Sequence, residues 1–251
     1  MKIWHDFKKV LDFHIVLVMG LAVLSTYLCR QLGWVADLPA NLIGIAVIFP
    51  LVFSINSAYR RREEALKAFA SLKGHMVALV FAHRDWSGRN PDIVARGLEL
   101  MESLFTAVND HFSNTPNKKS TQEVFHVFSQ ISESHEKMRE AGVPDLSRAN
   151  QYLRSIMIEF ERMNNIARYR TPVALRAYSR IFLNLFPILF GPYFANVSFP
   201  NMPFLGYVVA ALYAMVLVSL DNIQDHLENP FDGVGPDDLR LDISDYYKQL
   251  V

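Results

Sequence analysis

Four long stretches without a charged residue constrain this chain more than any other feature of its sequence. They cover residues 13–29, 38–58, 181–197 and 202–220, and none contains Asp, Glu, Lys or Arg. Each is close to the roughly 20 residues that an α-helix needs to cross a hydrocarbon core of about 30 Å. Because a charge at that depth is costly, such stretches are rare by chance. The sequence therefore predicts a polytopic membrane protein with four transmembrane helices.

The first stretch has an alternative explanation, because basic residues before an apolar stretch are also typical of a cleaved signal peptide. Lys2, Lys8 and Lys9 supply that basic start. A cleavage site would place small residues at the end of the stretch, whereas Arg30 and Gln31 follow it here. We therefore predict that the first stretch is a retained spanning helix.

The distribution of Lys and Arg predicts the orientation in the membrane. The short connectors at 33–37 and 196–201 contain neither residue, whereas basic residues gather at the other ends of the stretches. These are Lys2, Lys8, Lys9, Arg60, Arg61, Arg62, Arg168, Arg170, Arg176 and Arg180. Since positive charges favour the cytoplasmic side, we predict a multi-pass protein of the inner or plasma membrane of the cell, with both termini in the cytoplasm.

The segment between the second and third stretches has the period of amphipathic helices. Apolar residues recur at intervals of three and four, and helix breakers separate these series near residues 86–91, 114–120 and 141–144. Asn90 and Ser87 are candidate helix caps, and Pro91 suits a first helical turn. The second stretch has no clear stop before residue 83, so it predicts one long helix that contains Pro50.

The predicted fold class is therefore all-α. We divide the chain into an N-terminal transmembrane helix pair, a cytosolic helical region, a C-terminal transmembrane helix pair and an acidic cytosolic tail. These segments are residues 1–58, 59–179, 180–221 and 222–251, in that order.

Composition and motifs exclude some functions. The chain has 25 basic and 25 acidic residues, whereas a nucleic-acid partner usually requires a basic surplus. It contains no G-x-S-x-G, P-loop, G-x-G-x-x-G or H-E-x-x-H motif, so we expect no enzymatic activity. His75, His83, His126 and His135 lack the spacing of a metal pair, and we interpret them as exposed or interface residues.

Two features of the spans are compatible with an ion pathway. Ile45, Phe49 and Phe53 recur every four residues, which would place them on one face of the second helix. Copies of this face around an axis would form an apolar constriction that gates ions by dewetting. Such stripes more often pack against lipid or another helix. In the third stretch, Pro187 and Gly191 predict a broken helix, which membranes tolerate where it is buried or lines a cavity.

The acidic tail offers candidate calcium ligands. Asp232, Asp237 and Asp238 could bind this ion through carboxylate oxygens. A tail that is simply solvated explains the same residues, and we expect no other cofactor.

Several local motifs resemble those of the bestrophin family. Residues 166–178, with Thr171-Pro172, are similar to the stretch that leads into that family's third span. Residues 227–232 (LENPFD) and 237–242 (DDLRLD) are similar to its motif after the last span, and the apolar face of the second helix matches its neck. The resemblance covers nearly the whole chain. A run of three arginines after the neck and a glycine that comes one residue late indicate a divergent, bacterial branch.

The resemblance implies a homopentamer with one central pore that conducts small inorganic ions passively. Its neck would be lined by Ile45, Phe49 and Phe53, and a second constriction would lie near Leu146 or Leu153. The family includes chloride channels and cation channels, and an apolar neck does not choose between them. The alternative is a membrane-anchored helical interaction or sensor protein without conduction, in which replacing Phe49 by alanine would do little.

Overall fold

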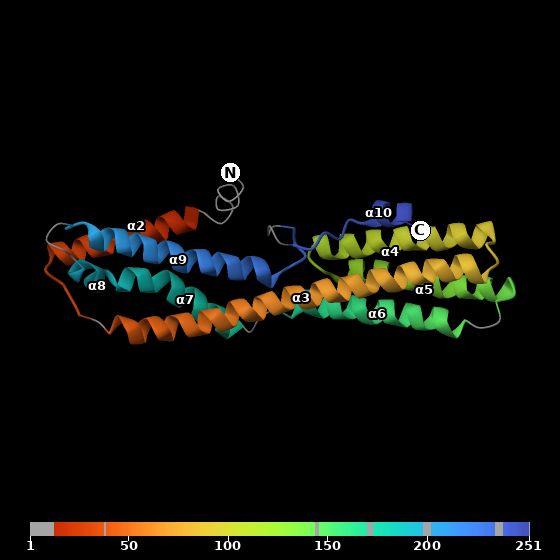
Figure 1. Cartoon of the computed structure of the whole chain (residues 1–251), viewed down its shortest axis with the longest axis horizontal. Helices are drawn as coiled ribbons and strands as arrows, with labels where there is room; N and C mark the ends of the chain where they lie inside the picture. The colour runs from red at the N-terminus through yellow and green to blue at the C-terminus, as the bar shows by residue number, and fades with distance from the viewer. Residues whose placement is uncertain are drawn as a thin grey trace. The chain divides into compact units, whose positions relative to one another are not determined.

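Every regular element of this protein is an α-helix, as the computed structural model shows for residues 13–37, 39–143, 146–169, 173–197, 202–233 and 238–250 (Figure 1). This confirms the predicted all-α class. The helices are α2 (Phe13–Gln31), α3 (Ala40–Trp86), α4 (Pro91–Ser113), α5 (Lys118–Glu140), α6 (Ser147–Arg168), α7 (Val173–Leu189), α8 (Gly191–Asn196), α9 (Leu205–Glu228) and α10 (Ser244–Leu250).

The chain folds into two compact units. The first unit comprises Met1–Arg60 and Thr171–Glu228, and the second comprises Arg61–Arg170 and Asn229–Val251. Helix α3 contributes its first part to one unit and its second part to the other, as one uninterrupted helix. The prediction that the second apolar stretch continues as one long helix past Pro50 is therefore confirmed.

The first unit packs α2 against α7, α8 and α9. Its core contains Ile15 and Val18 of α2, Phe190 and Phe194 near α8, and small residues at the contact between α2 and α9. Such small residues allow two helices in a membrane to approach closely. Large apolar side chains lie exposed on the outer faces of the same helices, where lipid would cover them (Leu17, Leu21, Leu24, Leu28, Val208, Leu212 and Val216).

Three helices of the described ranges are long and apolar enough to cross a membrane. They are α2, a part of α3 that begins at Ile48, and α9. The predicted span at 181–197 is not a single helix, because α7 ends at Leu189 and α8 begins at Gly191. Pro187 and Pro192 lack the amide hydrogen that a continuous helix needs, which favours a break at this point. The predicted break is therefore present, at Phe190 between the 17-residue α7 and the six-residue α8.

The second unit is a bundle of the C-terminal part of α3 with α4, α5 and α6. Its core is rich in aromatic rings around the fully buried Phe160, whose centroid lies 5.9 Å from that of Phe112 and 5.7 Å from that of Phe128. The segment after α9 returns to this core, where Phe231 stacks on Phe112 at 4.7 Å. Helix α10 packs on α4, and the Lys248 ammonium lies 2.7 Å from the Glu102 carboxylate.

The N-terminus of α4 follows the sequence prediction closely. The side chain of Asn90 accepts a hydrogen bond from the Asp92 amide at 3.0 Å, and Pro91 occupies the first turn. This cap satisfies one of the helix's otherwise unpaired amides. Ser87 is not a cap of α4, because its hydroxyl donates to the His83 carbonyl at the end of α3.

One glycine of the first unit permits a backbone contact that no other residue would allow. A Cβ at Gly206 would overlap the carbonyl oxygens of Phe194 and Val197, whereas a Cβ at Gly20 would meet no atom within 4 Å. We expect Gly206→Ala to lower stability by about 1–3 kcal/mol, because backbone must shift to make room. Thermal unfolding of the detergent-extracted protein measures this, with Gly20→Ala as the matched control. Equal midpoints for the two variants would contradict the packing described.

Candidate functional site

The three predicted neck residues lie exposed on the first part of α3. The side chains of Ile45, Phe49 and Phe53 are 52%, 58% and 65% exposed, and the two phenyl centroids lie 6.2 Å apart. Residues four apart advance by only about 40° around a helix, so the three form one narrow strip. The buried side of α3 is different, with Leu51 packed against α7 and α9. The strip therefore faces away from the core of its own unit.

The chemistry of the strip changes along the helix. Asn56, Ser57 and Arg60 follow Phe53 and are exposed as well. The exposed face of α3 thus passes from bulky apolar groups through neutral polar groups to a cation within the first unit. Lipid tails suit only the apolar part of such a face, whereas the polar end requires water or lipid headgroups.

The two residues predicted for a second constriction lie in packed positions of the second unit. Leu146 is half-buried at the N-terminus of α6 and packs on a small cluster of Ile93, Met138 and Val143. Leu153 is only 8% exposed and belongs to the main core of the unit. Their role in a constriction stays a prediction.

Leu153 also borders an open groove of about 840 Å³ along α6. Arg61 lies at this groove, and its guanidinium donates to the carbonyls of Ile166 and Tyr169 at the end of α6. These carbonyls have no partner within the helix, so the arginine serves as their cap. The remaining lining combines apolar and charged side chains, namely Glu64, Asn150, Arg154, Met157, Ile158, Glu161, Arg162 and Asn165.

The candidate calcium ligands are not gathered into a site by the described residues. Asp232 is exposed and accepts a hydrogen bond from the Asn229 amide at 2.7 Å, and Asp238 is half-buried. Asp237 lies outside the described residues. Within the ranges that the structure describes, no three His, Cys, Asp or Glu side chains lie close enough to hold a metal ion. Calcium binding stays a prediction.

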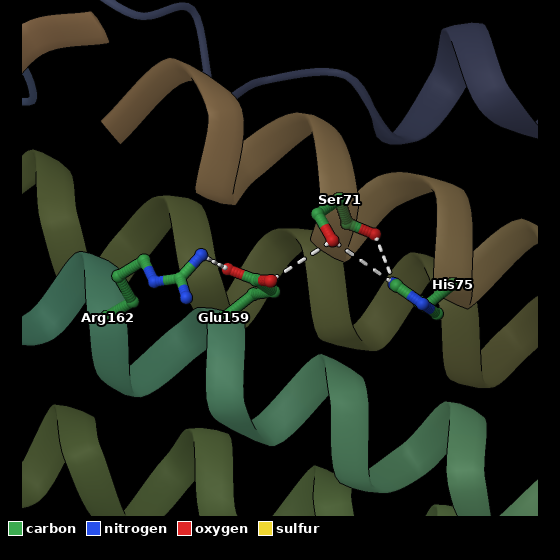
Figure 2. Close-up of polar contacts among 4 residues, drawn as sticks. All are labelled: Ser71, His75, Glu159 and Arg162. Atoms are coloured by element: carbon green, nitrogen blue, oxygen red, sulfur yellow. Dashed lines mark hydrogen bonds and ion pairs between the residues drawn. The ribbon is translucent and has the colours of Figure 1, made fainter. Parts of the chain in front are cut away.

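A serine, a histidine and a glutamate lie close together between α3 and α6 (Figure 2). The Ser71 hydroxyl donates to Glu159 at 3.2 Å, and Glu159 also pairs with Arg162 at 3.0 Å. His75 Nδ1 lies 2.8 Å from the carbonyl oxygen of Ser71. Because a carbonyl only accepts hydrogen bonds, Nδ1 carries a hydrogen and cannot take the serine proton as a catalytic base would. The cluster therefore has a structural role, in which the hydrogen bond from Ser71 to Glu159 connects α3 to α6.

Two of the histidines expected to be exposed or at an interface are instead buried. His83 and His135 are 1% and 3% exposed in the core of the second unit. Hydrogen bonds to the Leu79 carbonyl, Ser134 and Asn150 offset the cost of burying the polar rings. That expectation was wrong because Ser134 lies 51 positions from His83 and Asn150 lies 15 positions from His135, too far along the chain for local spacing to reveal these contacts.

A third buried imidazole, His111, has no signal in the sequence. Its two ring nitrogens lie 2.8 Å from Ser120 Oγ and 3.3 Å from Asn164 Oδ1. Burial lowers the pKa of His111, although the hydrogen bond with Asn164 opposes this effect. Burial likewise lowers the pKa of His135, against the hydrogen bond with Asn150. Both rings are thereby held neutral near physiological pH.

The chain is similar in fold to solved structures, although its sequence matches no family model. No protein-family model matches the chain, and no curated protein does. The chain is similar to the structure of a bacterial Bestrophin homolog from Klebsiella pneumoniae solved by Zn-SAD phasing, with 18% identity over 94% of this chain and 95% of that chain, and a TM-score of 0.75.

Two further solved structures agree with it. A mutant of the Klebsiella pneumoniae homolog has 18% identity over 94% of each chain and a TM-score of 0.78. A mutant described as a membrane protein has 19% identity over 95% of each chain and a TM-score of 0.74. Such identities establish similarity of fold, and the chain therefore has the fold of the bacterial bestrophin homologs.

Proposed function

We propose that this chain is the subunit of a homopentameric ion channel, in which the strip of Ile45, Phe49 and Phe53 lines an apolar neck. The observation that carries the proposal is the exposure of this strip, with side chains 52–65% accessible, in a chain with a bestrophin-like fold. A bulky apolar strip that faces away from its own unit needs either lipid or other copies of the chain to cover it.

The channel proposal requires that symmetric copies of the chain cover the strip. One helix cannot enclose a pore, so a conducting path requires several copies around a common axis. In such a ring the two phenylalanines would narrow the path and control ion passage by excluding water. Asn56, Ser57 and Arg60, which continue the exposed face, would then line a water-filled vestibule.

Transport through this path would be passive. The sequence contains no P-loop that would couple transport to a nucleotide. The permeating species would be small inorganic ions, chloride among the candidates, because the neck presents carbon and no fixed charge. Leu146 and Leu153 remain candidates for a second constriction.

The location follows from charge. Arg60, Arg61 and Arg62 come directly after the membrane part of α3. We infer that this end of α3 and the second unit lie in the cytoplasm, with both termini on the same side of the inner or plasma membrane, because arginines favour that side.

The alternative function is that of a membrane-anchored interaction or sensor protein. The groove of about 840 Å³ along α6 is the observation that favours it, because it offers apolar and charged groups to a partner. In this case the exposed strip on α3 would contact lipid, and its residues would not affect any current.

We expect Phe49→Ala to raise the single-channel conductance by about twofold or more, because a ring of smaller side chains widens and wets the neck. Recordings in a planar bilayer with a tenfold KCl gradient measure this, and the sign of the reversal potential distinguishes anion from cation conduction. Phe204→Ala is the matched control, since Phe204 is 59% exposed but lies outside the strip. Silence of all three proteins, shown to be folded and oligomeric, would favour the anchor or sensor function.

The subunit number is a separate prediction. We expect the detergent-extracted protein to have five times the mass of one chain, because the proposed neck requires a closed ring and the resemblance to bestrophins implies five copies. Native mass spectrometry or light scattering measures this directly. A monomer, under conditions that preserve the helical content, would contradict the pentamer and with it a pore along a symmetry axis.

A further inference from the structure

His83, in the last turn of α3, is a buried titratable residue that the proposed neck does not use. The ring is 1% exposed and lies against α4 and α5. Gly97 of α4 makes this contact possible, because a Cβ at that position would lie 3.0 Å from Cβ of His83. Serine supplies the polar contact from α5, where Ser134 Oγ lies 2.9 Å from His83 Nε2. Three helices therefore meet at one titratable ring.

The hydrogen bonds of this ring suit the neutral form. His83 Nδ1 lies 2.8 Å from the Leu79 carbonyl oxygen, so Nδ1 carries a hydrogen. In the neutral ring Nε2 is then an acceptor, and the Ser134 hydroxyl can donate to it. Both ring nitrogens are satisfied in this state.

The same atoms also suit the charged form. Ser134 Oγ lies 2.6 Å from the Ile131 carbonyl oxygen, which offers the hydroxyl a second acceptor. When Nε2 is protonated it can donate to Ser134 Oγ, while the hydroxyl turns to Ile131. The imidazolium then has an acceptor for each N–H once the hydroxyl has rotated. Burial opposes the charge and lowers the pKa of His83, and the hydrogen bond to the Leu79 carbonyl acts in the other direction. A cation in the last turn of a helix is also stabilised by the helix dipole.

The neighbouring histidine lacks this property. His135 Nδ1 donates to Asn150 Oδ1 at 2.8 Å, but its Nε2 is buried and has no hydrogen-bond partner among the described residues. Protonation of His135 would therefore bury an N–H without an acceptor. The two rings lie 6.2 Å apart, so a charge on one opposes a charge on the other. The pair can hold one proton, and His83 is the ring equipped to hold it.

A cavity of about 310 Å³ borders His83 and Ser134. His83 and Ser134 both line it, although each residue is almost fully buried. Titratable and charged groups surround the two from every adjoining helix: Arg84 and Asp85 on α3, Asp92, Arg96 and Glu99 on α4, and His135, Glu136 and Lys137 on α5. The lining of the cavity itself holds two acidic side chains, Asp92 and Glu99, and two basic ones, Arg96 and Lys137, so these formal charges cancel.

We propose that the His83–Ser134 pair is a proton-responsive joint between α3, α4 and α5, which takes up one proton on acidification as the Ser134 hydroxyl turns from His83 to Ile131. Because α3 also carries the strip of Ile45, Phe49 and Phe53, the proton changes conduction. This last consequence rests on the proposed channel function, whereas the proton uptake does not.

The proton uptake is tested on the full chain in detergent by hydrogen–deuterium exchange at the imidazole C2 position, followed by mass spectrometry between pH 4.5 and 8. We expect His83 to titrate within this range and at a higher pH than His135. Ser134→Ala removes the acceptor of the charged ring, so it should lower the midpoint of His83 by about one pH unit or more, a tenfold loss of proton affinity. Ser134→Thr retains a hydroxyl and should keep the midpoint.

Two results would overturn the joint: no titration of His83 in the folded wild-type protein, or the same midpoint in wild type and Ser134→Ala. The wild-type titration decides the first point even if both serine variants fail to fold.

The consequence for conduction is tested by bilayer recordings in which the bath facing the second unit is varied from pH 8 to 5.5. We expect the current to change around the His83 midpoint, and the change to move to lower pH in Ser134→Ala. Currents that ignore pH would overturn the link to conduction. The absence of current together with a normal His83 titration would instead count against the proposed channel and support the proton uptake by itself.

Discussion

The whole structure depends on α3 remaining helical along its full length. In hydrocarbon every backbone amide and carbonyl must be paired within its own segment, which a helix achieves and a loop does not. Pro50 removes one of these bonds inside α3, yet the helix continues from Ala40 to Trp86. One helix therefore contributes an exposed apolar strip to the first unit and a buried face to the second. Its buried face in the second unit is made of Ala65, Ala68, Phe69, Leu72, Met76 and Leu79.

The helices themselves could be predicted because their causes are local. Apolar period and charge-free length placed α2, the membrane part of α3 and α9, and Asn90-Pro91 marked the start of α4. Pro187 and Gly191 predicted a break in the third stretch. They did not predict that the break would lie at Phe190, between two separate helices. Helix α7 ends at Leu189 within the apolar stretch, α8 begins at Gly191, and both helices pack against α2 and α9.

The site was predictable in part, for the same reason. Spacing put Ile45, Phe49 and Phe53 on one face, but only the structure shows that Leu51 occupies the packed side and that the strip is left uncovered. Contacts between distant segments escaped the sequence altogether. His83 meets Ser134 across 51 positions of the chain and His111 meets Asn164 across 53, so nothing in the local pattern could indicate that these rings are buried.

The proposed apolar neck would have a consequence for regulation. Carbon surfaces carry no charge and bind no proton, so acidity cannot act on Ile45, Phe49 or Phe53 directly. A response to pH must enter elsewhere and reach the neck through an element with two arrangements. His83 occupies the same helix as the strip, and its serine partner gives it two hydrogen-bonded states with different charge. If both proposals hold, the apolar strip would be separated from the titratable group, and the strip would stay free of polar atoms while proton uptake acts at another part of the same helix.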